Sequence, residues 1–188
     1  PDKTHYKIVK RLLNLNKNIF CEKPLTLHHD KSKELFNLAK KRNIILYVDD
    51  IQTYYQKKIK LFKENFITRR KKGVGNPKDL LYRFAYHDFY YLADKLKKKK
   101  IKSILIKDIT KDLRFDIVYK DNSIYRFYYS LRFDKKVHKV NNFSFVTKKD
   151  LLSVMIKKVL KKNVNFKKNE EISLFSNKLI DEVKKKLS

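Results

Sequence analysis

The chain has 188 residues, enough for one large or two small domains, and its 48 Lys and Arg against 20 Asp and Glu give a formal net charge of +28. Such a charge is typical of proteins that bind nucleic acid or an anionic membrane. Here, however, the excess is mostly lysine, and the chain has only two glycines and no tryptophan, which is the composition that AT-rich coding sequence would produce. One cysteine, Cys21, excludes an internal disulfide, and the histidines lack metal-binding spacing. No apolar run approaches a membrane span. We therefore expect a cytoplasmic protein without a metal, a membrane or a specific nucleic-acid partner.

Helix and strand patterns alternate over the first 50 residues. Apolar residues recur at the helical period in residues 4–13 and again in residues 30–42. The apolar runs at 18–21 and 44–48 read as buried strands. Asn16 tolerates the left-handed conformation that ends a helix. This alternation predicts parallel strands joined by crossover helices, which is an α/β arrangement.

The first of these strands stops abruptly at Glu22, Lys23 and Pro24. Proline lacks the N–H that a strand ladder needs, so Pro24 ends the strand. In an open α/β sheet, ligands bind beyond the carboxyl ends of the strands. Lys23 is therefore our candidate for a catalytic residue.

Four stretches of the sequence resemble the glucose-fructose oxidoreductase and inositol dehydrogenase family. Members of that family have Thr-Pro-x-x-x-His before a helix, Gly-Lys-x-Val-x-x-Glu-Lys-Pro-Leu, a helix ending in Ala-x-x-x-Gly, and a later helix containing His-Asp. The corresponding stretches here are residues 1–5, 16–25, 38–48 and 86–89. They occur in the family order and at similar spacing, which is more specific than Glu-Lys-Pro alone.

The resemblance implies a fold, a reaction and a set of residues. The implied fold is the C-terminal part of a Rossmann-like parallel sheet domain followed by an α+β domain with a mainly antiparallel open sheet. The implied reaction is NAD- or NADP-dependent oxidation at a hydroxyl of a sugar, sugar nucleotide or cyclitol. Lys23 and His87 are implied as catalytic residues, and Glu22, Lys23, Pro24 and His5 as residues near the cofactor.

Two features depart from the family pattern. The only glycines are Gly73 and Gly75, so the glycine-rich turn that holds the cofactor pyrophosphate is missing. By comparison with the family we expect that roughly seventy residues are absent and that the chain is N-terminally truncated. The family also has an aspartate four residues before the helix histidine, where this chain has Arg83. Arginine cannot accept a proton, and beside His87 it would disfavour the imidazolium.

The middle of the chain predicts a bridge between two domains. Residues 54–66 have apolar residues at helical spacing, and residues 68–77 are basic and aperiodic, as in an exposed connector. We place a dinucleotide-binding portion at residues 1–66 and a substrate-binding and oligomerisation domain at residues 67–188. Asp79 can cap an aromatic helix over residues 80–96 that contains His87, with Asp88 structural.

The remainder predicts a sheet and two closing helices. Residues 113–119 and 125–131 alternate as strands around an Asp121-Asn122 turn. With residues 102–108 and 137–146 they form an antiparallel sheet of about four strands. By resemblance, its open aromatic face is expected to make a homo-oligomer. Thr147 to Asp150 and Asn169 to Glu171 are expected to start two helices whose apolar stripes belong to the core.

Three functions remain open from the sequence. The favoured one is the sugar oxidoreductase, with a small-molecule substrate. The second is a truncated or degenerate relative without activity, because Arg83 replaces an acid and the phosphate loop is missing. The third is a basic nucleic-acid-binding protein, which is supported only by the high positive charge and the aromatic content of the chain.

Overall fold

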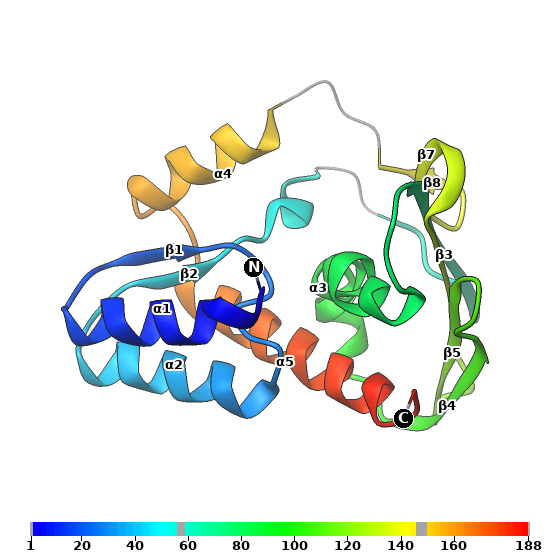
Figure 1. Cartoon of the computed structure of the whole chain (residues 1–188), viewed down its shortest axis with the longest axis horizontal. Coiled ribbons are helices and arrows are strands. Elements are labelled where there is room, and N and C mark those ends of the chain that lie inside the picture. The colour runs from blue at the N-terminus through cyan, green and yellow to red at the C-terminus, as the bar shows by residue number, and fades with distance from the viewer. Residues whose placement is uncertain (1, 56–58, 146–149, 188) are drawn as a thin grey trace.

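Helices and parallel strands alternate at the start of the chain, as the sequence predicts (Figure 1). The computed structural model describes residues 2–55, 59–145 and 150–187. The first elements are α1 (Asp2–Asn14), β1 (Ile19–Cys21), α2 (His29–Lys41) and β2 (Leu46–Val48). Strand β1 pairs in parallel with β2, with Ile19 opposite Leu46. Asn16 has a φ of 53° and ends the α1 segment, which confirms its predicted role.

Helices α1 and α2 lie on the same face of this pair of strands (Figure 1). The residues buried between them are Val9, Leu13, Ile19, Cys21, Leu35, Phe36, Ala39, Leu46 and Val48. On the opposite face Phe20 stacks on Tyr47, whose ring meets the edge of Phe166 from the C-terminal helix. Strand β2 is buried on both faces, as its continuous apolar run indicates, whereas Phe20 of β1 is 40% exposed.

A six-stranded mixed sheet forms the second part of the molecule. Its strands are β3 (Glu64–Lys72), β4 (Ile101–Asp108), β5 (Leu113–Tyr119), β6 (Ile124–Ser130), β7 (Arg132–Val140) and β8 (Phe143–Ser144). The spatial order is β4-β5-β6-β3-β7-β8, with β3 parallel to β6 and the other pairs antiparallel. Asn122 has a φ of 61° in the β5–β6 turn, so the predicted hairpin is confirmed. The predicted sheet is confirmed as mainly antiparallel but has two more strands than expected.

Strand β3 replaces the predicted bridge helix and part of the predicted connector. Residues 59–63 have no regular structure, and the strand starts at Glu64, so the helix predicted over residues 54–66 is wrong. Residues 68–72, predicted as an exposed loop, belong to the strand. The basic side chains concealed the period of two: Ile67 is fully buried and Phe66 is exposed. The partners of β3 lie far along the chain, in β6 and β7.

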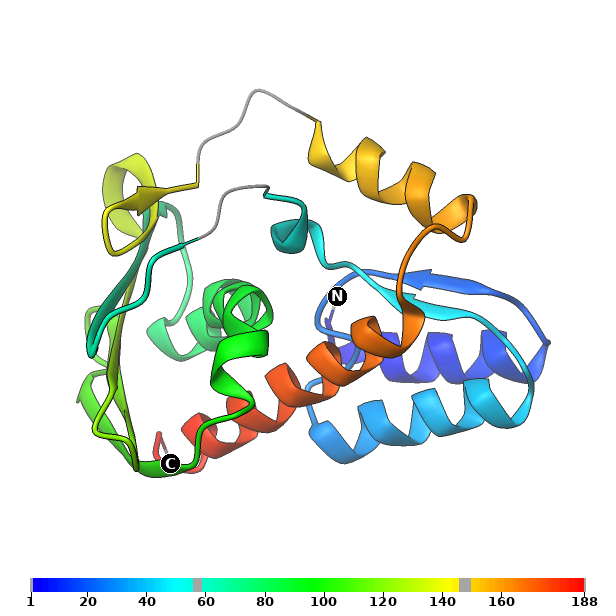
Figure 2. The ribbon, with the colours of Figure 1, turned by 180° about the vertical axis from the view of Figure 1, so that it is seen from behind.

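Helices α3 (Tyr86–Leu96) and α5 (Phe166–Lys184) cover the inner face of this sheet (Figure 2). A π-helical turn, Leu81–Ala85, precedes α3, so the predicted helix over residues 80–96 is largely confirmed. Phe89 packs edge-on against Phe115 and Phe127, which stack on each other at 4.8 Å between ring centres. The aromatic residues of the hairpin strands thus meet the aromatic helix, and together they form the larger core.

The last two helices depart from prediction at their starts and on one face. Asp150 caps α4 (Leu151–Leu160) by accepting a hydrogen bond from the Ser153 N–H, whereas Thr147 lies outside the described residues. Helix α5 starts one turn earlier than predicted, because Asn165 rather than Asn169 caps it. The stripe of α5 is buried, but the predicted stripe of α4 is core only in part: Leu151 and Met155 are buried, whereas Leu152, Ile156 and Leu160 are exposed.

Helix α5 joins the two parts of the molecule through polar contacts. The Asn169 side chain exchanges hydrogen bonds of 3.0 and 2.8 Å with the Val48 N–H and carbonyl, as a strand would. Asp181 accepts from the His29 N–H at 2.8 Å. The predicted boundary between residues 66 and 67 falls inside β3, and the division into two domains stays a proposal.

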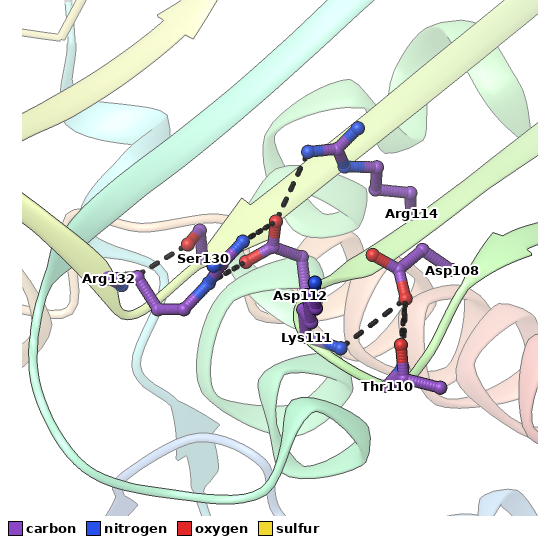
Figure 3. A network of polar contacts seen from close by, with 7 residues as sticks. All are labelled: Asp108, Thr110, Lys111, Asp112, Arg114, Ser130 and Arg132. Carbon is purple, nitrogen blue, oxygen red and sulfur yellow. Dashed lines mark hydrogen bonds and ion pairs between the residues drawn. The ribbon is translucent and has the colours of Figure 1, made fainter.

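A polar network joins the first residue of β7 to the segment just before β5 (Figure 3). Arg132 donates two hydrogen bonds to Asp112, at 3.1 and 2.9 Å, and Arg114 donates a third at 3.2 Å. Burial alone would raise the pKa of Asp112, but the bonds from Arg132, Ser130 and Arg114 outweigh it and lower the pKa to about 2. The network therefore sets the position of β7, the strand that carries His138.

None of the helices in the described part of the chain combines the length and the apolarity that crossing a bilayer requires.

Candidate active site

Lys23 lies where the sequence predicts it, just beyond the carboxyl end of β1. The strand ends at Cys21, whose carbonyl accepts a hydrogen bond of 2.8 Å from the Asp49 N–H at the end of β2. The half-buried Lys23 side chain crosses to the second part of the molecule and donates to the Tyr82 carbonyl at 3.4 Å. The strand end thus delivers its lysine to the junction between the two parts.

His5 and Pro24 hold the loop that carries Lys23. The His5 ring nitrogen Nδ1 lies 2.8 Å from the Pro24 carbonyl oxygen, which ties α1 to the loop. Pro24 is buried and the Lys23–Pro24 peptide bond is cis. Glu22 is exposed beside the loop. The structure thus brings all four predicted cofactor residues together, and their contact with a cofactor stays a prediction.

Tyr82 belongs to the π-helical turn in front of α3. Such turns are wider than an α-helix and often occur at functional sites. The Tyr82 hydroxyl also donates to the Leu27 carbonyl at 3.4 Å, so the turn contacts the first part of the molecule at two places. One irregular turn therefore connects the strand-end loop to the helix of His87.

His87 is half-buried in the first turn of α3. Burial lowers its pKa well below 6.5, and the charges of Lys23, Arg69 and His138 lower it further. The imidazole is therefore neutral at pH 7 and can accept a proton. Lys23 and His87, which the sequence predicted from separate motifs, lie within electrostatic reach of each other.

The predicted effect of Arg83 on His87 is wrong. The Arg83 guanidinium donates to the Val74 carbonyl at 3.0 Å, in the loop that follows β3. A spacing of four residues brings two side chains to one face of an α-helix, but the π-helical turn between Arg83 and His87 changes that relation. The cations that depress the pKa of His87 are Lys23 and Arg69 instead.

A buried network behind His87 was not predicted. His138 Nε2 lies 2.6 Å from Asp88 Oδ1, and Arg69 Nη2 lies 3.3 Å from His138 Nδ1. Phe145 stacks on the His138 ring at 3.9 Å between centres. Burial lowers the pKa of His138 although the Asp88 carboxylate opposes it, which fits a neutral ring that donates from Nε2 and accepts at Nδ1.

The alternation along β7 was the available signal for His138. His138 and Val140 are buried and Lys139 between them is exposed, so the histidine lies on the inner face. The structure also confirms that Asp88 points to a different partner from His87. Asp88 and His138 form a buried contact next to the predicted catalytic residue His87 in the sequence of α3.

Two carboxylates stand at the end of β2, next to the Lys23 loop. The pKa of Asp49 is raised to about 6, mainly by burial. The hydrogen bond from the Ile51 N–H opposes this by lowering the pKa, whereas the charges of Glu22 and Asp50 raise it. Burial also raises the pKa of Asp50. Among the described residues, no group of three or more His, Cys, Asp or Glu is arranged to hold a metal ion.

A cavity of about 590 Å³ lies on another side of the β2 end, among the 3-10 turn Ile51–Tyr54, α4 and the start of α5. Asp50, Tyr54, Lys158 and Asn165 are among its walls. Neither Lys23 nor His87 lines it. The predicted catalytic residues therefore lie outside this cavity.

Comparison with known proteins agrees with the fold and with the first stretch of sequence. Residues 1–50 match the model of an oxidoreductase family with an NAD-binding Rossmann fold. An uncharacterized oxidoreductase of Schizosaccharomyces pombe is 46% identical over 48 residues, which are 26% of this chain and 13% of that protein. The match thus spans a small part of the relative's length.

Solved structures share the fold over nearly the whole chain. The UDP-N-acetylglucosamine 3-dehydrogenase of Acidithiobacillus ferrooxidans has a TM-score of 0.76 at 12% identity, covering 97% of this chain and 74% of that one. A mutant 3-ketoreductase of Actinomadura kijaniata, in complex with TDP-benzene and NADP, has a TM-score of 0.73 at 12% identity, covering 98% and 74%. Residues 1–50 thus match an oxidoreductase family with an NAD-binding Rossmann fold, and the chain as a whole shares the fold of these dehydrogenases and reductases.

Proposed function

We propose that this chain is the part of an NAD- or NADP-dependent oxidoreductase that carries the substrate site but not the phosphate-binding half. The enzyme acts on a hydroxyl of a sugar, sugar nucleotide or cyclitol. The observation that carries the proposal is that Lys23, from the end of β1, reaches the turn in front of α3, and that its charge contributes to the lowered pKa of His87 in that helix. A cationic donor and a neutral base at one place are what oxidation of a hydroxyl needs from a protein. One of the solved structures named above is, by its name, a dehydrogenase of UDP-N-acetylglucosamine.

The residues present fit a dinucleotide at this place. Strands β1 and β2 are parallel, and their carboxyl ends carry Lys23 and Asp49 at one edge of the sheet. The reacting end of a bound dinucleotide lies beyond that edge in sheets of this kind. Glu22, Lys23, Pro24 and His5 are the residues that would line it. When bound, the nicotinamide accepts the hydride from the carbon being oxidised.

Lys23 and His87 supply the hydrogen-bond donor and the base. The Lys23 ammonium hydrogen-bonds the substrate oxygen and stabilises the negative charge that develops on it. His87 takes the hydroxyl proton at its unprotonated ring nitrogen, because burial and neighbouring cations keep that nitrogen free of a proton at pH 7. His138 and Asp88 fix the wall of the site behind α3.

The two glycines bear on where the cofactor phosphates bind. Gly73 and Gly75 lie in the loop between β3 and the 3-10 turn Pro77–Asp79, and neither belongs to the segment that holds the parallel strands β1 and β2. We place the pyrophosphate site outside residues 1–188. Residues 1–188 should therefore bind NAD weakly, with a Kd of about 1 mM or higher, because the backbone donors that hold the phosphates are missing. Titration calorimetry measures this, and binding in the micromolar range would contradict the placement.

The outer face of the large sheet is the surface we propose for a homo-oligomer. Phe66 is 54% exposed there, and Leu105 is 43% exposed. The guanidinium of Arg70 lies 4.4 Å from the ring centre of Phe133, and that of Arg114 lies 4.1 Å from Tyr128. Stacked arginine and aromatic groups are enriched in protein interfaces.

A further inference from the structure

Four cations gather beside the candidate active site, and we call them the cationic cluster: Arg69 and Lys71 of β3, Arg83 of the π-helical turn, and Lys136 of β7. The Arg69 guanidinium carbon and the Lys71 Nζ lie 5.5 and 5.6 Å from the ring centre of Phe84. Phe84 is buried in the core that the sheet covers, so both side chains lie on the inner face of the sheet. Lys136 is two residues from the inward His138 on β7, and residues two apart in a strand point to the same face.

The loop after β3 brings Arg83 into this cluster. Its guanidinium donates to the Val74 carbonyl at 3.0 Å. At Gly75 a Cβ would lie 2.7 Å from Arg83 Nη1, and the φ of 154° there is one that glycine adopts most readily. A glycine at this position therefore allows the loop to close over the guanidinium and to hold it in place.

The cluster is poor in compensating acids: Asp88 interacts with the charge of Arg69, whereas no acid in the described ranges contributes to the pKa of Lys71. Among the described residues, the four cations make no ion pair with a carboxylate within 4.0 Å. Other cations of the same sheet are paired: Lys72 with Asp134 at 3.0 Å and Arg132 with Asp112 at 2.9 Å. Burial lowers the pKa of Lys71, and the charges of Arg83, Lys136 and Arg69 lower it further. Unpaired like charges held this close cost stability, and a bound anion would relieve that cost.

The cluster is continuous with the reactive pair. Arg69 bonds the Phe84 carbonyl at 3.3 Å and contacts His138, and its charge reaches His87. An anion held here is therefore adjacent to the place where the substrate hydroxyl meets His87 and Lys23. Guanidinium groups match the oxygens of a phosphate in geometry, and two of the four cations are arginines.

We propose that the cationic cluster binds a phosphate or diphosphate group of the substrate, so that the substrate is a phosphorylated sugar or a nucleotide sugar and not a neutral polyol. The choice of substrate rests on the function proposed above, whereas the anion site itself stands on the cluster alone. Each charge-assisted hydrogen bond lost from such a site costs about 1.5–3 kcal/mol, which corresponds to a 10- to 100-fold change in Kd.

Titration of residues 1–188 with inorganic pyrophosphate at 150 mM salt tests the anion site. We expect Lys71→Gln and Arg83→Gln to weaken binding by about 10-fold or more each. The matched control is Lys72→Gln, from the same strand but outside the cluster and paired with Asp134, which should change Kd by less than about 2-fold. Lys71→Arg should keep binding, which separates lost charge from lost fold.

The outcomes separate the inference from the proposed function. Equal weakening by Lys72→Gln would mean diffuse attraction to a basic protein, and it would overturn the site, as would absence of binding. Duplex DNA bound more tightly than pyrophosphate, with the same sensitivity to Lys71, would overturn the inference in favour of nucleic acid. If the protein oxidises myo-inositol, and this turnover requires Lys23 but not Lys71, the inference of a phosphorylated substrate would be wrong. The proposed oxidoreductase function would then be supported. Pyrophosphate binding in a protein that oxidises neither class of substrate would leave the anion site and refute the oxidoreductase.

Discussion

Lys23→Met should lower turnover by about two to three orders of magnitude in the protein supplied with cofactor and substrate. Methionine keeps much of the aliphatic stem but removes the charge and the donors that meet the developing negative charge. Loss of one such donor costs about 2.7–4 kcal/mol of transition-state stabilisation. Cofactor affinity should change little, because the dinucleotide is held mainly through its phosphates. Steady-state rates and cofactor titration on the same variant measure the two effects.

A matched lysine controls for general loss of positive charge. Lys10 lies on α1 and is paired with Glu34 at 2.7 Å, in the same part of the molecule as Lys23. Lys10→Met should leave turnover within about 2-fold of the wild type, because exposed ion pairs contribute little. Full turnover in Lys23→Met would show that the strand-end lysine is only a solvated charge, and the catalytic assignment would fail.

Asp88→Ala should destabilise the protein by about 3–5 kcal/mol, which is a large share of the 5–15 kcal/mol that holds a typical domain folded. The substitution leaves Arg69 without its buried counter-charge and the His138 Nε2–H without an acceptor. Burial alone would raise the pKa of Asp88, but the contacts with His138 and Arg69 lower it, so the carboxylate is charged in the folded protein. Urea denaturation at pH 7 measures the loss.

The exposed Asp134 is the control for this prediction. Its carboxylate pairs with Lys72 at the surface of the same sheet, where both side chains are more than 80% exposed. Asp134→Ala should change stability by less than about 0.5 kcal/mol. Equal losses in the two variants would mean that the Asp88–His138 contact does not hold the sheet to α3.

Local periodicity was sufficient for the elements that pack on their sequence neighbours. Helices α1 and α2 and strands β1 and β2 bury one another within the first 50 residues, so their apolar positions repeat at the expected intervals. The same holds for the hairpin of β5 and β6, where Asn122 marks the turn. Lys23 and His87 were predicted by motif, and in the fold the charge of Lys23 contributes to the lowered pKa of His87.

Elements whose partners are distant were missed or misassigned. The basic strand β3 depends on β6 and β7, and nothing local distinguishes it from a loop. Arg69 and His138 meet only because those strands pair, so their network with Asp88 could not be predicted. The stripe of α4 is apolar at helical spacing, but periodicity does not show whether another element covers it, and Leu160 is 78% exposed.

The most direct measurement of the central claim is the pKa of His87 in the wild type and in Lys23→Met. The claim is that a strand-end lysine and a helix histidine, from the two parts of the molecule, form one site. The ammonium of Lys23 lowers the pKa of His87, so its removal should raise that pKa toward 6.5. The His87 ring proton, assigned by its loss in His87→Gln, can be followed by NMR titration, with Lys10→Met as the unchanged control. A raised pKa in Lys23→Met alone is the result that the site predicts, and an identical pKa in all three proteins would contradict it.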